Sequence, residues 1–403
     1  MRYIKNLEDV HKYLPDGYHE ACIEISGYCN AKCKYCPSGK ASSQKRKMMD
    51  AETFKAIVSK LQEYKIIGDG SHVNLFWWGE PFLNPNLKQI IKVTQDRGVE
   101  YILSTNAFFY QQLEQADVKN LKRLIISMPG FSQESYNRIH QFDFEVIKEN
   151  IKRYANDLER AGCKDKIWLA YHVYQFNINE IYSCYEFCHD LGIAFDPGFA
   201  FPLLVEERVK YAKGELDAGR KEEMLKEIVT DQLDKMIASS TRTECIYQTR
   251  NFVVDEFGEV YGCLNLEHNE ANACGNLFND DINDILKRIY ELKACDECIA
   301  CGVAPTDMSF RFYFDSWFQM MKIRKFYEDC CSKMDVAKGK IMLTLRETEN
   351  DIDDTERRYK FVEVKELMVK DGIGISEVEE IIDCYGKRPS ELKKNFYNFL
   401  RGE

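Results

Sequence analysis

The stretch CIEISGYCNAKCKYC, residues 22–36, joins a short β-rich run directly to three cysteines. The run Cys22–Ser26 is followed by Cys29, Cys33 and Cys36 in a C-x3-C-x2-C arrangement. Three thiolates within eight residues can converge on one metal centre. The stretch therefore predicts a strand whose carboxyl end carries a metal-binding loop.

Beyond this stretch, β-rich runs alternate with longer helical patterns from about residue 20 to residue 200. Asp50 is the expected N-cap of a helix over AETFKAIVSKLQEY. The predicted strands are Cys22–Ser26, Val73–Phe76, Tyr101–Ser104, Leu124–Ser127, Ile167–Tyr174 and Ile193–Phe195. Six such units predict an α/β fold with a parallel sheet, a partial (β/α)6 TIM-like barrel.

Polar residues follow several of these strands, where barrels of this kind gather their active sites. The second strand runs into Trp78, Gly79, Glu80 and Pro81, the third into Ser104, Thr105 and Asn106, and the fourth into Ser127. We expect these residues to share one site with the three cysteines.

Three cysteine ligands leave one coordination position to be filled. A structural zinc normally closes its fourth position with another Cys or His, and none lies nearby in the sequence. A [4Fe-4S] cluster with three protein thiolates instead leaves one iron free for a substrate or cofactor. The pattern therefore favours an iron-sulfur cluster over zinc.

The CNAKCKYC segment resembles the signature of the radical S-adenosylmethionine (SAM) enzymes, C-x3-C-x-aromatic-C after the first strand of a partial barrel, with Tyr35 as the aromatic residue. The resemblance implies that Cys29, Cys33 and Cys36 hold a [4Fe-4S] cluster whose open iron binds SAM. It also implies that reductive cleavage of SAM releases a 5'-deoxyadenosyl radical, which abstracts hydrogen from a substrate.

The same resemblance assigns further cofactor contacts. In WWGEP, Gly79 and Glu80 occupy the family's Gly-Glu-Pro position, where the carboxylate binds the methionine amino group, and Trp78 replaces a more usual glycine. Ser104 and Asn106 match the polar positions of the family's STNG segment, and Ser127 a ribose or carboxylate contact. Arg138 is assigned here as a further contact, although His140 occupies the expected arginine position.

A second group of cysteines follows the barrel pattern. Cys245, the Gly258-x4-Cys263 hairpin pattern, a GN-helix segment and CDECIAC resemble the SPASM and twitch extensions of some radical SAM enzymes, which bind auxiliary [4Fe-4S] clusters. The shorter spacing here fits one auxiliary cluster. The preferred ligands are Cys245, Cys263, Cys295 and Cys298, with Cys301 as a substitute for either of the last two. Cys274 and a zinc ribbon remain alternatives.

The chain thus divides into a lead-in at residues 1–19, a barrel at 20–235, a small Cys-rich SPASM/twitch domain at 241–303 and a helical C-terminal extension at 304–403. With 55 Lys and Arg against 66 Asp and Glu, the net charge of −11 argues against nucleic acid or membrane partners. The chain shows neither a signal peptide nor an apolar stretch long enough to span a membrane, so we expect a cytoplasmic protein.

Three other features are predicted to be structural or are left open. Cys184 and Cys188, at helical spacing, are expected in the core. The aromatic run Phe310–Phe318 is expected to pack between parts of the protein. On the fifth strand Tyr171 and His172 point to opposite faces, and the sequence leaves open which of them faces the site.

For the reaction, we expect a radical SAM oxidoreductase that oxidises a small polar substrate of the sugar or aminocyclitol type, with a low-potential donor such as flavodoxin or ferredoxin. The alternative is a SPASM maturase of a ribosomally made peptide. The roughly twenty residues before the first strand are too few for the leader-binding domain that such maturases often carry. A third hypothesis, an iron-sulfur electron carrier, would not require Glu80.

Overall fold

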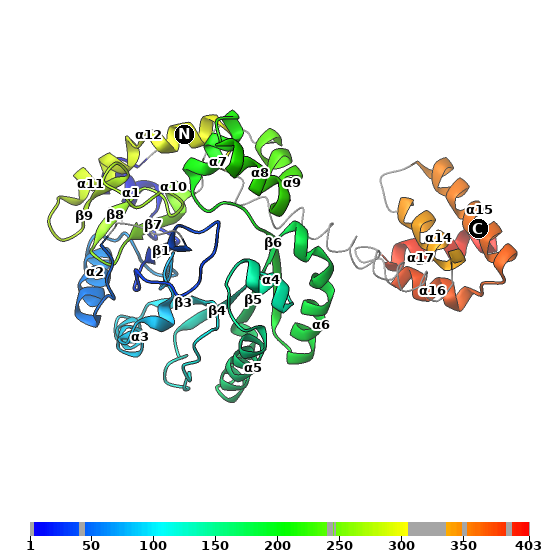
Figure 1. Ribbon diagram of the computed structural model, residues 1–403, viewed down its shortest axis with the longest axis horizontal. Coiled ribbons are helices and arrows are strands. Elements are labelled where there is room, and N and C mark those ends of the chain that lie inside the picture. The colour runs from blue at the N-terminus through cyan, green and yellow to red at the C-terminus, as the bar shows by residue number, and fades with distance from the viewer. Residues whose placement is uncertain are drawn as a thin grey trace. The chain divides into compact units, whose positions relative to one another are not determined.

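The computed structural model describes residues 4–39, 45–239, 245, 247–304, 336–348, 353–383 and 389–402. The chain forms two compact units, residues 1–310 and 311–403, which are described separately. Figure 1 shows the first unit as a curved sheet with helices along its outer side. Within the described residues no helix is long and apolar enough to cross a bilayer.

The first unit is built on one nine-stranded sheet, in the order β6-β5-β4-β3-β2-β1-β7-β8-β9. The strands from β6 to β7 in this order are parallel, and β8 and β9 are antiparallel to their neighbours. The bounds are β1 Glu20–Ile23, β2 His72–Asn74, β3 Glu100–Thr105, β4 Leu121–Met128, β5 Ile167–Val173, β6 Ala194–Phe199, β7 Asn251–Val254, β8 Glu259–Tyr261 and β9 Ala273–Asn276. The predicted α/β class and parallel sheet are therefore confirmed.

Helices between the strands bury one apolar face each, as their 3.6-residue periodicity requires. The α-helices of this unit are α1 Leu7–Tyr13, α2 Ala51–Glu63, α3 Leu87–Asp96, α4 Gln133–Arg138, α5 Phe144–Arg160, α6 Ile181–Leu191, α7 Val205–Lys213, α8 Ala218–Glu227, α9 Thr230–Ser239, α10 Tyr247–Arg250, α11 Ile282–Tyr290 and α12 Lys293–Ala300. Short 3-10 helices are Pro37–Gly39, Pro81–Leu83, Lys164–Lys166 and Gln175–Glu180. Asp50 caps α2 as predicted, because its side chain accepts a hydrogen bond from the Thr53 amide.

The core lies between the sheet and these helices. On α2, Phe54, Ile57 and Leu61 are fully buried at helical intervals. In β1, Ala21–Ile23 are buried on both faces, as expected for a strand in the middle of a parallel sheet. Cys184 and Cys188 are also buried, which agrees with the predicted packing role.

The cysteine-rich region continues the barrel sheet. Strand β7 pairs in parallel with β1, from Glu20 opposite Asn251 to Ile23 opposite Val254. Strands β7 and β8 form the expected hairpin, whose turn ends at Gly258 with a φ of +84°. A Cβ there would lie 2.5 Å from the Phe278 ring, so the turn requires glycine.

The described part of the second unit is helical. Its helices are α14 Val336–Glu347, α15 Asp354–Asp371, α16 Ile375–Asp383 and α17 Pro389–Arg401. They enclose an apolar core that includes Met342, Val364, Ile381 and Phe396. The run Phe310–Phe318 lies outside the described residues, as do Cys330, Cys331 and Cys384.

Candidate active site

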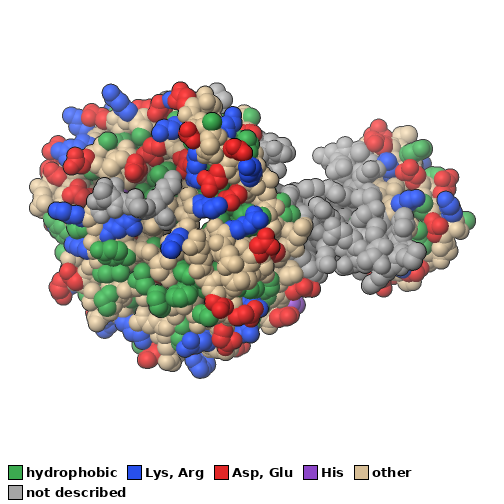
Figure 2. Space-filling view, viewed as in Figure 1, with side chains coloured by type: hydrophobic (Ala, Val, Ile, Leu, Met, Phe, Trp, Pro, Cys, Tyr) green, Lys and Arg blue, Asp and Glu red, His purple; other side chains and the backbone are tan. Residues whose placement is uncertain are grey.

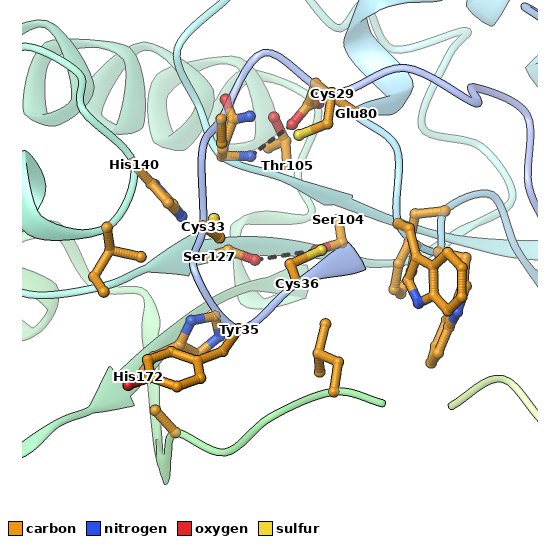
Figure 3. A pocket seen from close by; sticks show the side chains of 18 of the residues that line it. Cys29, Cys33, Tyr35, Cys36, Glu80, Ser104, Thr105, Ser127, His140 and His172 are labelled. Carbon is orange, nitrogen blue, oxygen red and sulfur yellow. Dashed lines mark hydrogen bonds between the residues drawn. The ribbon is translucent and has the colours of Figure 1, made fainter. Parts of the chain in front are cut away.

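A cavity of about 280 Å³ lies at the carboxyl ends of the parallel strands (Figure 3). Polar, cysteine and glycine residues around it are Cys29, Cys33, Cys36, Gly79, Glu80, Ser104, Thr105, Asn106, Ser127, His140 and His172. Its apolar and aromatic walls are Ala31, Tyr35, Phe76, Trp77, Trp78, Ile139, Tyr174, Phe199, Ala200, Phe201 and Leu203. The structure therefore brings together every predicted residue of the first site except Arg138.

The three thiols of the first cysteine loop face this cavity. Burial raises the pKa of Cys29 to about 12 and that of Cys33 well above its usual range. Such thiols keep their protons unless a metal cation replaces them. In the described part of the chain, no three Cys, His, Asp or Glu side chains are arranged to hold a single metal ion. In a four-iron cluster each thiolate binds a different iron, so three thiols that do not converge on one point are compatible with such a cluster.

Glu80 is buried beside the cysteine loop, with 3% of its surface exposed. Its two carboxylate oxygens accept hydrogen bonds from the amides of Phe82, at 3.1 Å, and Asn106, at 2.8 Å. Burial raises the pKa of Glu80 to about 7. A carboxylate in this state is stabilised by a cationic partner such as an amino group.

Glu24 holds the loop that carries Glu80, a role that the sequence analysis missed. One oxygen of Glu24 accepts hydrogen bonds from the amides of Trp78, at 2.5 Å, and Gly79, at 3.1 Å. A Cβ on Gly79 would lie 1.5 Å from the Ser26 carbonyl oxygen, so the loop can take this path only with glycine. In the sequence Glu24 stands inside the predicted strand Cys22–Ser26, and its position after the strand is known only from the structure, in which β1 ends at Ile23.

The serines and the asparagine extend the polar wall. The hydroxyls of Ser104 and Ser127 lie 3.4 Å apart at the ends of neighbouring strands β3 and β4. The side chain of Asn106 donates to the Asn30 side chain at 2.9 Å, which connects this wall to the cysteine loop. These groups can bind hydroxyl and carboxylate groups of a ligand.

Tyr35 anchors the cysteine loop to α8. Its hydroxyl donates to Glu227 at 3.0 Å, and the guanidinium of Arg220 lies 4.6 Å from the centre of its ring. Lys34 also pairs with Glu227, at 2.7 Å. The sequence analysis assigned no contact with the cysteine loop to α8, so this anchoring was missed.

Arg138 lies outside the cavity, and His140 and His172 line it instead. Arg138 pairs with Glu134 at 3.3 Å, one turn earlier on α4, and 43% of its side chain is exposed. Helical periodicity therefore turns Arg138 away from the site.

Burial lowers the pKa of His140 to about 3 and that of His172 to about 4, so both imidazoles are neutral. The sequence left open whether Tyr171 or His172 on β5 faces the site, and in the structure it is His172.

The four preferred cysteines of the second group line another cavity, of about 20 Å³. These residues are Cys245, Cys263, Cys295 and Cys298. Burial raises the pKa of Cys263 well above its usual range, and the neighbouring thiols raise it further. Cys301 packs against the surrounding apolar cluster but does not line the cavity. Cys274 also lies outside it and is fully buried.

A short segment separates the two cysteine sites. The Leu203 amide donates to the Tyr35 carbonyl at 3.0 Å, and the Val205 amide donates to the Asn265 carbonyl at 2.8 Å. Leu203 lines the larger cavity and Val205 the smaller one. Two residues of extended chain span at most about 7 Å, so the two cavities are close neighbours.

Residues 23–187 match the family model described as the Radical SAM superfamily. These residues therefore form a radical SAM domain. The matched range contains the three cysteines of the first loop, Glu80 and the serines at the strand ends. The matched range therefore contains most of the residues that line the larger cavity, and Phe199, Ala200, Phe201 and Leu203 follow it in the sequence.

Similar proteins match parts of this chain. The uncharacterized protein MJ0804 of Methanocaldococcus jannaschii is 24% identical over 225 residues, which cover 53% of this chain and 66% of that protein. The S-adenosyl-L-methionine-dependent 2-deoxy-scyllo-inosamine dehydrogenase of Niallia circulans is 26% identical over 102 residues, which cover 25% of this chain and 38% of that protein. The chain thus spans less than two thirds of these relatives. The fold is similar to that of SuiB from Streptococcus suis bound to its precursor peptide SuiA, with a TM-score of 0.50 and 13% sequence identity. The similarity covers 72% of this chain and 70% of the SuiB chain.

Proposed function

We propose that this protein cleaves SAM reductively and uses the resulting radical to oxidise a small polar substrate of the sugar or aminocyclitol type. The observation that carries the proposal is the larger cavity, in which three thiols, a buried carboxylate and the strand-end hydroxyls face one space. An electron carrier would need the thiols but would not need the polar groups around them.

The residues of the cavity fit the group that the family implies. Cys29, Cys33 and Cys36 would hold a [4Fe-4S] cluster, and Glu80 would accept hydrogen bonds from the amino group of SAM. When bound, the cluster and SAM supply a 5'-deoxyadenosyl radical that can remove a hydrogen atom from substrate. Trp78 and the other apolar walls would exclude water from this chemistry.

The smaller cavity supports an auxiliary [4Fe-4S] cluster on Cys245, Cys263, Cys295 and Cys298, as in SPASM or twitch enzymes. Its buried thiols are stabilised as thiolates only by a metal, and four of them line one space. Because the smaller cavity is close to the larger one, an auxiliary cluster there would be able to accept an electron from the substrate, which favours net oxidation. Flavodoxin or ferredoxin would supply the electron for SAM cleavage.

The polar lining favours a small hydroxylated substrate. Ser127, His140 and His172 offer one hydroxyl and two neutral imidazoles to the cavity. The similarity to an aminocyclitol dehydrogenase supports the same class. The structural similarity to SuiB with its precursor peptide supports the alternative, maturation of a peptide.

Anaerobic assays of reconstituted protein test this proposal. With SAM and dithionite, we expect 5'-deoxyadenosine and methionine, both lost when Cys29, Cys33 and Cys36 are changed together to Ala. With 2-deoxy-scyllo-inosamine added, we expect the corresponding ketone. Absence of 5'-deoxyadenosine would overturn the radical chemistry, whereas 5'-deoxyadenosine without ketone from this or related aminocyclitols and sugars would overturn the substrate class.

A further inference from the structure

A separate cavity, of about 620 Å³, lies on the other side of the loop that carries Glu80. Trp78 and Gly79 line both this cavity and the proposed cofactor site. Its other walls come from the end of β1, the segment after the cysteine loop with Ser38, Lys45 and Arg46, the turn between β7 and β8, and the residues around His268. Nothing in the proposed chemistry uses this space.

Three buried carboxyl groups line this cavity. Glu24, Asp255 and Glu256 expose 4%, 6% and 6% of their surfaces. Sheet pairing brings them together, because the Glu24 amide donates to the Val254 carbonyl at 2.9 Å, immediately before the turn that carries the other two. The cavity therefore has an acidic wall contributed by two distant parts of the sequence.

The hydrogen bonds of Glu24 leave one of its carboxylate oxygens without a donor. One oxygen of Glu24 binds the Trp78 and Gly79 amides, but its Oε1 atom is buried without a hydrogen-bond partner. Asp255 accepts from the amides of Phe257, at 2.8 Å, and Glu259, at 2.9 Å. The unpartnered oxygen of Glu24 marks a place where a donor is missing.

No cation in the described residues forms an ion pair within 4.0 Å of these three carboxyls. Lys45 and Arg46 line the same cavity, and the Lys47 ammonium lies 4.9 Å from the centre of the Phe257 ring. The acidic side chains of Glu259 and Glu270 add negative charge to the lining. Arg46 and Lys47 attract Glu256 and Asp255 only from beyond ion-pair distance. Burying carboxylates without a directly paired cation is costly, so the wall favours either bound protons or a positively charged ligand.

The chemistry of the cavity points to an organic cation. Within the described chain no three acidic, His or Cys side chains are arranged around one point, as a metal ion would need. The volume suits a group of many atoms, and Trp78, Phe257 and Tyr261 provide apolar surface beside the acids. We propose that this acidic cavity binds the primary ammonium group of an organic ligand.

Two sources of such a group fit. One is a small amine, such as an aminocyclitol, and the other is a lysine side chain of a peptide. Both present an ammonium on an aliphatic body. The inference goes beyond the proposed SAM chemistry, because it concerns a binding site outside the cofactor cavity.

Glu256 provides the sharpest variant for testing the site. Glu256→Gln keeps the shape of the side chain and removes its charge. Gly27→Ala is an independent variant, because a Cβ there would lie 2.1 Å from the Glu256 carboxylate oxygen and would displace it. Glu114→Gln serves as a matched control, since that side chain is 65% exposed and lies outside the cavity.

Isothermal titration of the reconstituted protein with saturating SAM tests the inference. The probes are 2-deoxystreptamine and an acetylated tripeptide amide with a central lysine, and the neutral counterparts are myo-inositol and the same peptide with glutamine. We expect at least one amine to bind while its counterpart does not. Affinity should fall at least tenfold in Glu256→Gln and in Gly27→Ala, and should be unchanged in Glu114→Gln.

Which of the two amines binds identifies the source of the ammonium group, a small amine or a lysine side chain. Failure of both amines to bind, equal binding of the neutral counterparts, or full affinity in folded Glu256→Gln would overturn the inference. SAM cleavage without substrate, measured in parallel, should be the same in Glu256→Gln as in the unaltered protein. Loss of cleavage in every sample, with amine binding intact, would instead contradict the proposed function alone.

Discussion

At the scale of single residues, two buried glutamates fix the path of the loop after β2. Glu80 was predicted from its motif, because GEP after a strand has a recognisable pattern. Glu24 was not, because a single carboxylate in CIEIS gives no indication that it turns inward to bind two backbone amides. Side-chain partners from distant segments leave no local signal in a sequence.

Glu80→Gln tests the assignment of the cofactor's amino group. The amide side chain can still accept one backbone hydrogen bond, but it cannot form a charge-assisted pair with an ammonium. We expect the affinity for SAM to fall about 10- to 100-fold, corresponding to about 1.4–2.8 kcal/mol. Equilibrium dialysis with labelled SAM measures this, with the exposed Glu134→Gln as control. Unchanged affinity in Glu80→Gln would contradict the assignment.

His268 gives a prediction about acid stability. Its ring stacks between Trp78, at 4.1 Å, and Tyr261, at 4.0 Å, and burial lowers its pKa to about 3. Unfolded histidine titrates near 6.5, so its contribution to stability is complete above about pH 6.5 and is lost as pH falls toward 3.

His268→Phe keeps an aromatic ring in the stack and removes the titrating group. Between pH 6.5 and 4, the free energy of unfolding should therefore depend less steeply on pH, by at most about 1.4 kcal/mol per pH unit. Urea unfolding at several pH values measures the slope. Identical slopes in the two proteins would show that His268 does not resist protonation.

At the scale of elements, the sequence predicted the strands well and their extents less well. Buried β-rich runs are strong signals, and all six predicted strands overlap β1–β6. The predicted strand ended at Phe195, because Pro197 and Gly198 disfavour strand. In the structure β6 extends to Phe199. Pairing with β5 on one side overrides that local preference.

Helix α8 is expected to stabilise the cysteine loop. Arg220 binds Glu207 and Glu223, donates to the Lys34 carbonyl at 3.2 Å and covers Tyr35. Arg220→Ala should lower the free energy of unfolding by about 1–3 kcal/mol, because it leaves this network incomplete. Urea unfolding measures the change.

Lys226→Ala on the same helix is the matched control. Its side chain is 70% exposed and pairs only with Glu222, one turn away, so we expect a loss below about 0.5 kcal/mol. Equal effects of the two substitutions would mean that α8 acts through its helical stability rather than through its contacts with the cysteine loop.

At the scale of the whole molecule, one sheet connects the two cysteine sites. Strand β7 beside β1 makes the cysteine-rich region continuous with the barrel strands, which sequence spacing could not predict because the pairing joins residues more than 200 positions apart. Figure 2 shows acidic and basic side chains intermixed on the viewed face of the first unit, as the modest net charge suggests. The four cysteines that line the smaller cavity are those preferred as ligands from the resemblance to SPASM and twitch extensions.

Iron content tests the two-site arrangement. Reconstituted protein should hold about eight irons, from two four-iron clusters. Changing Cys29, Cys33 and Cys36 to Ala should leave about four, and changing Cys245, Cys263, Cys295 and Cys298 to Ala should also leave about four. About four irons in the unaltered protein would contradict the second site.

Electron paramagnetic resonance tests the central claim, an open iron on the first cysteine loop, most directly. In the variant that lacks Cys245, Cys263, Cys295 and Cys298, the dithionite-reduced spectrum reports the first cluster alone. We predict that adding SAM changes this spectrum, because SAM would bind the iron without a protein ligand. A spectrum unchanged by saturating SAM would show that no iron is available to it, and would contradict the account.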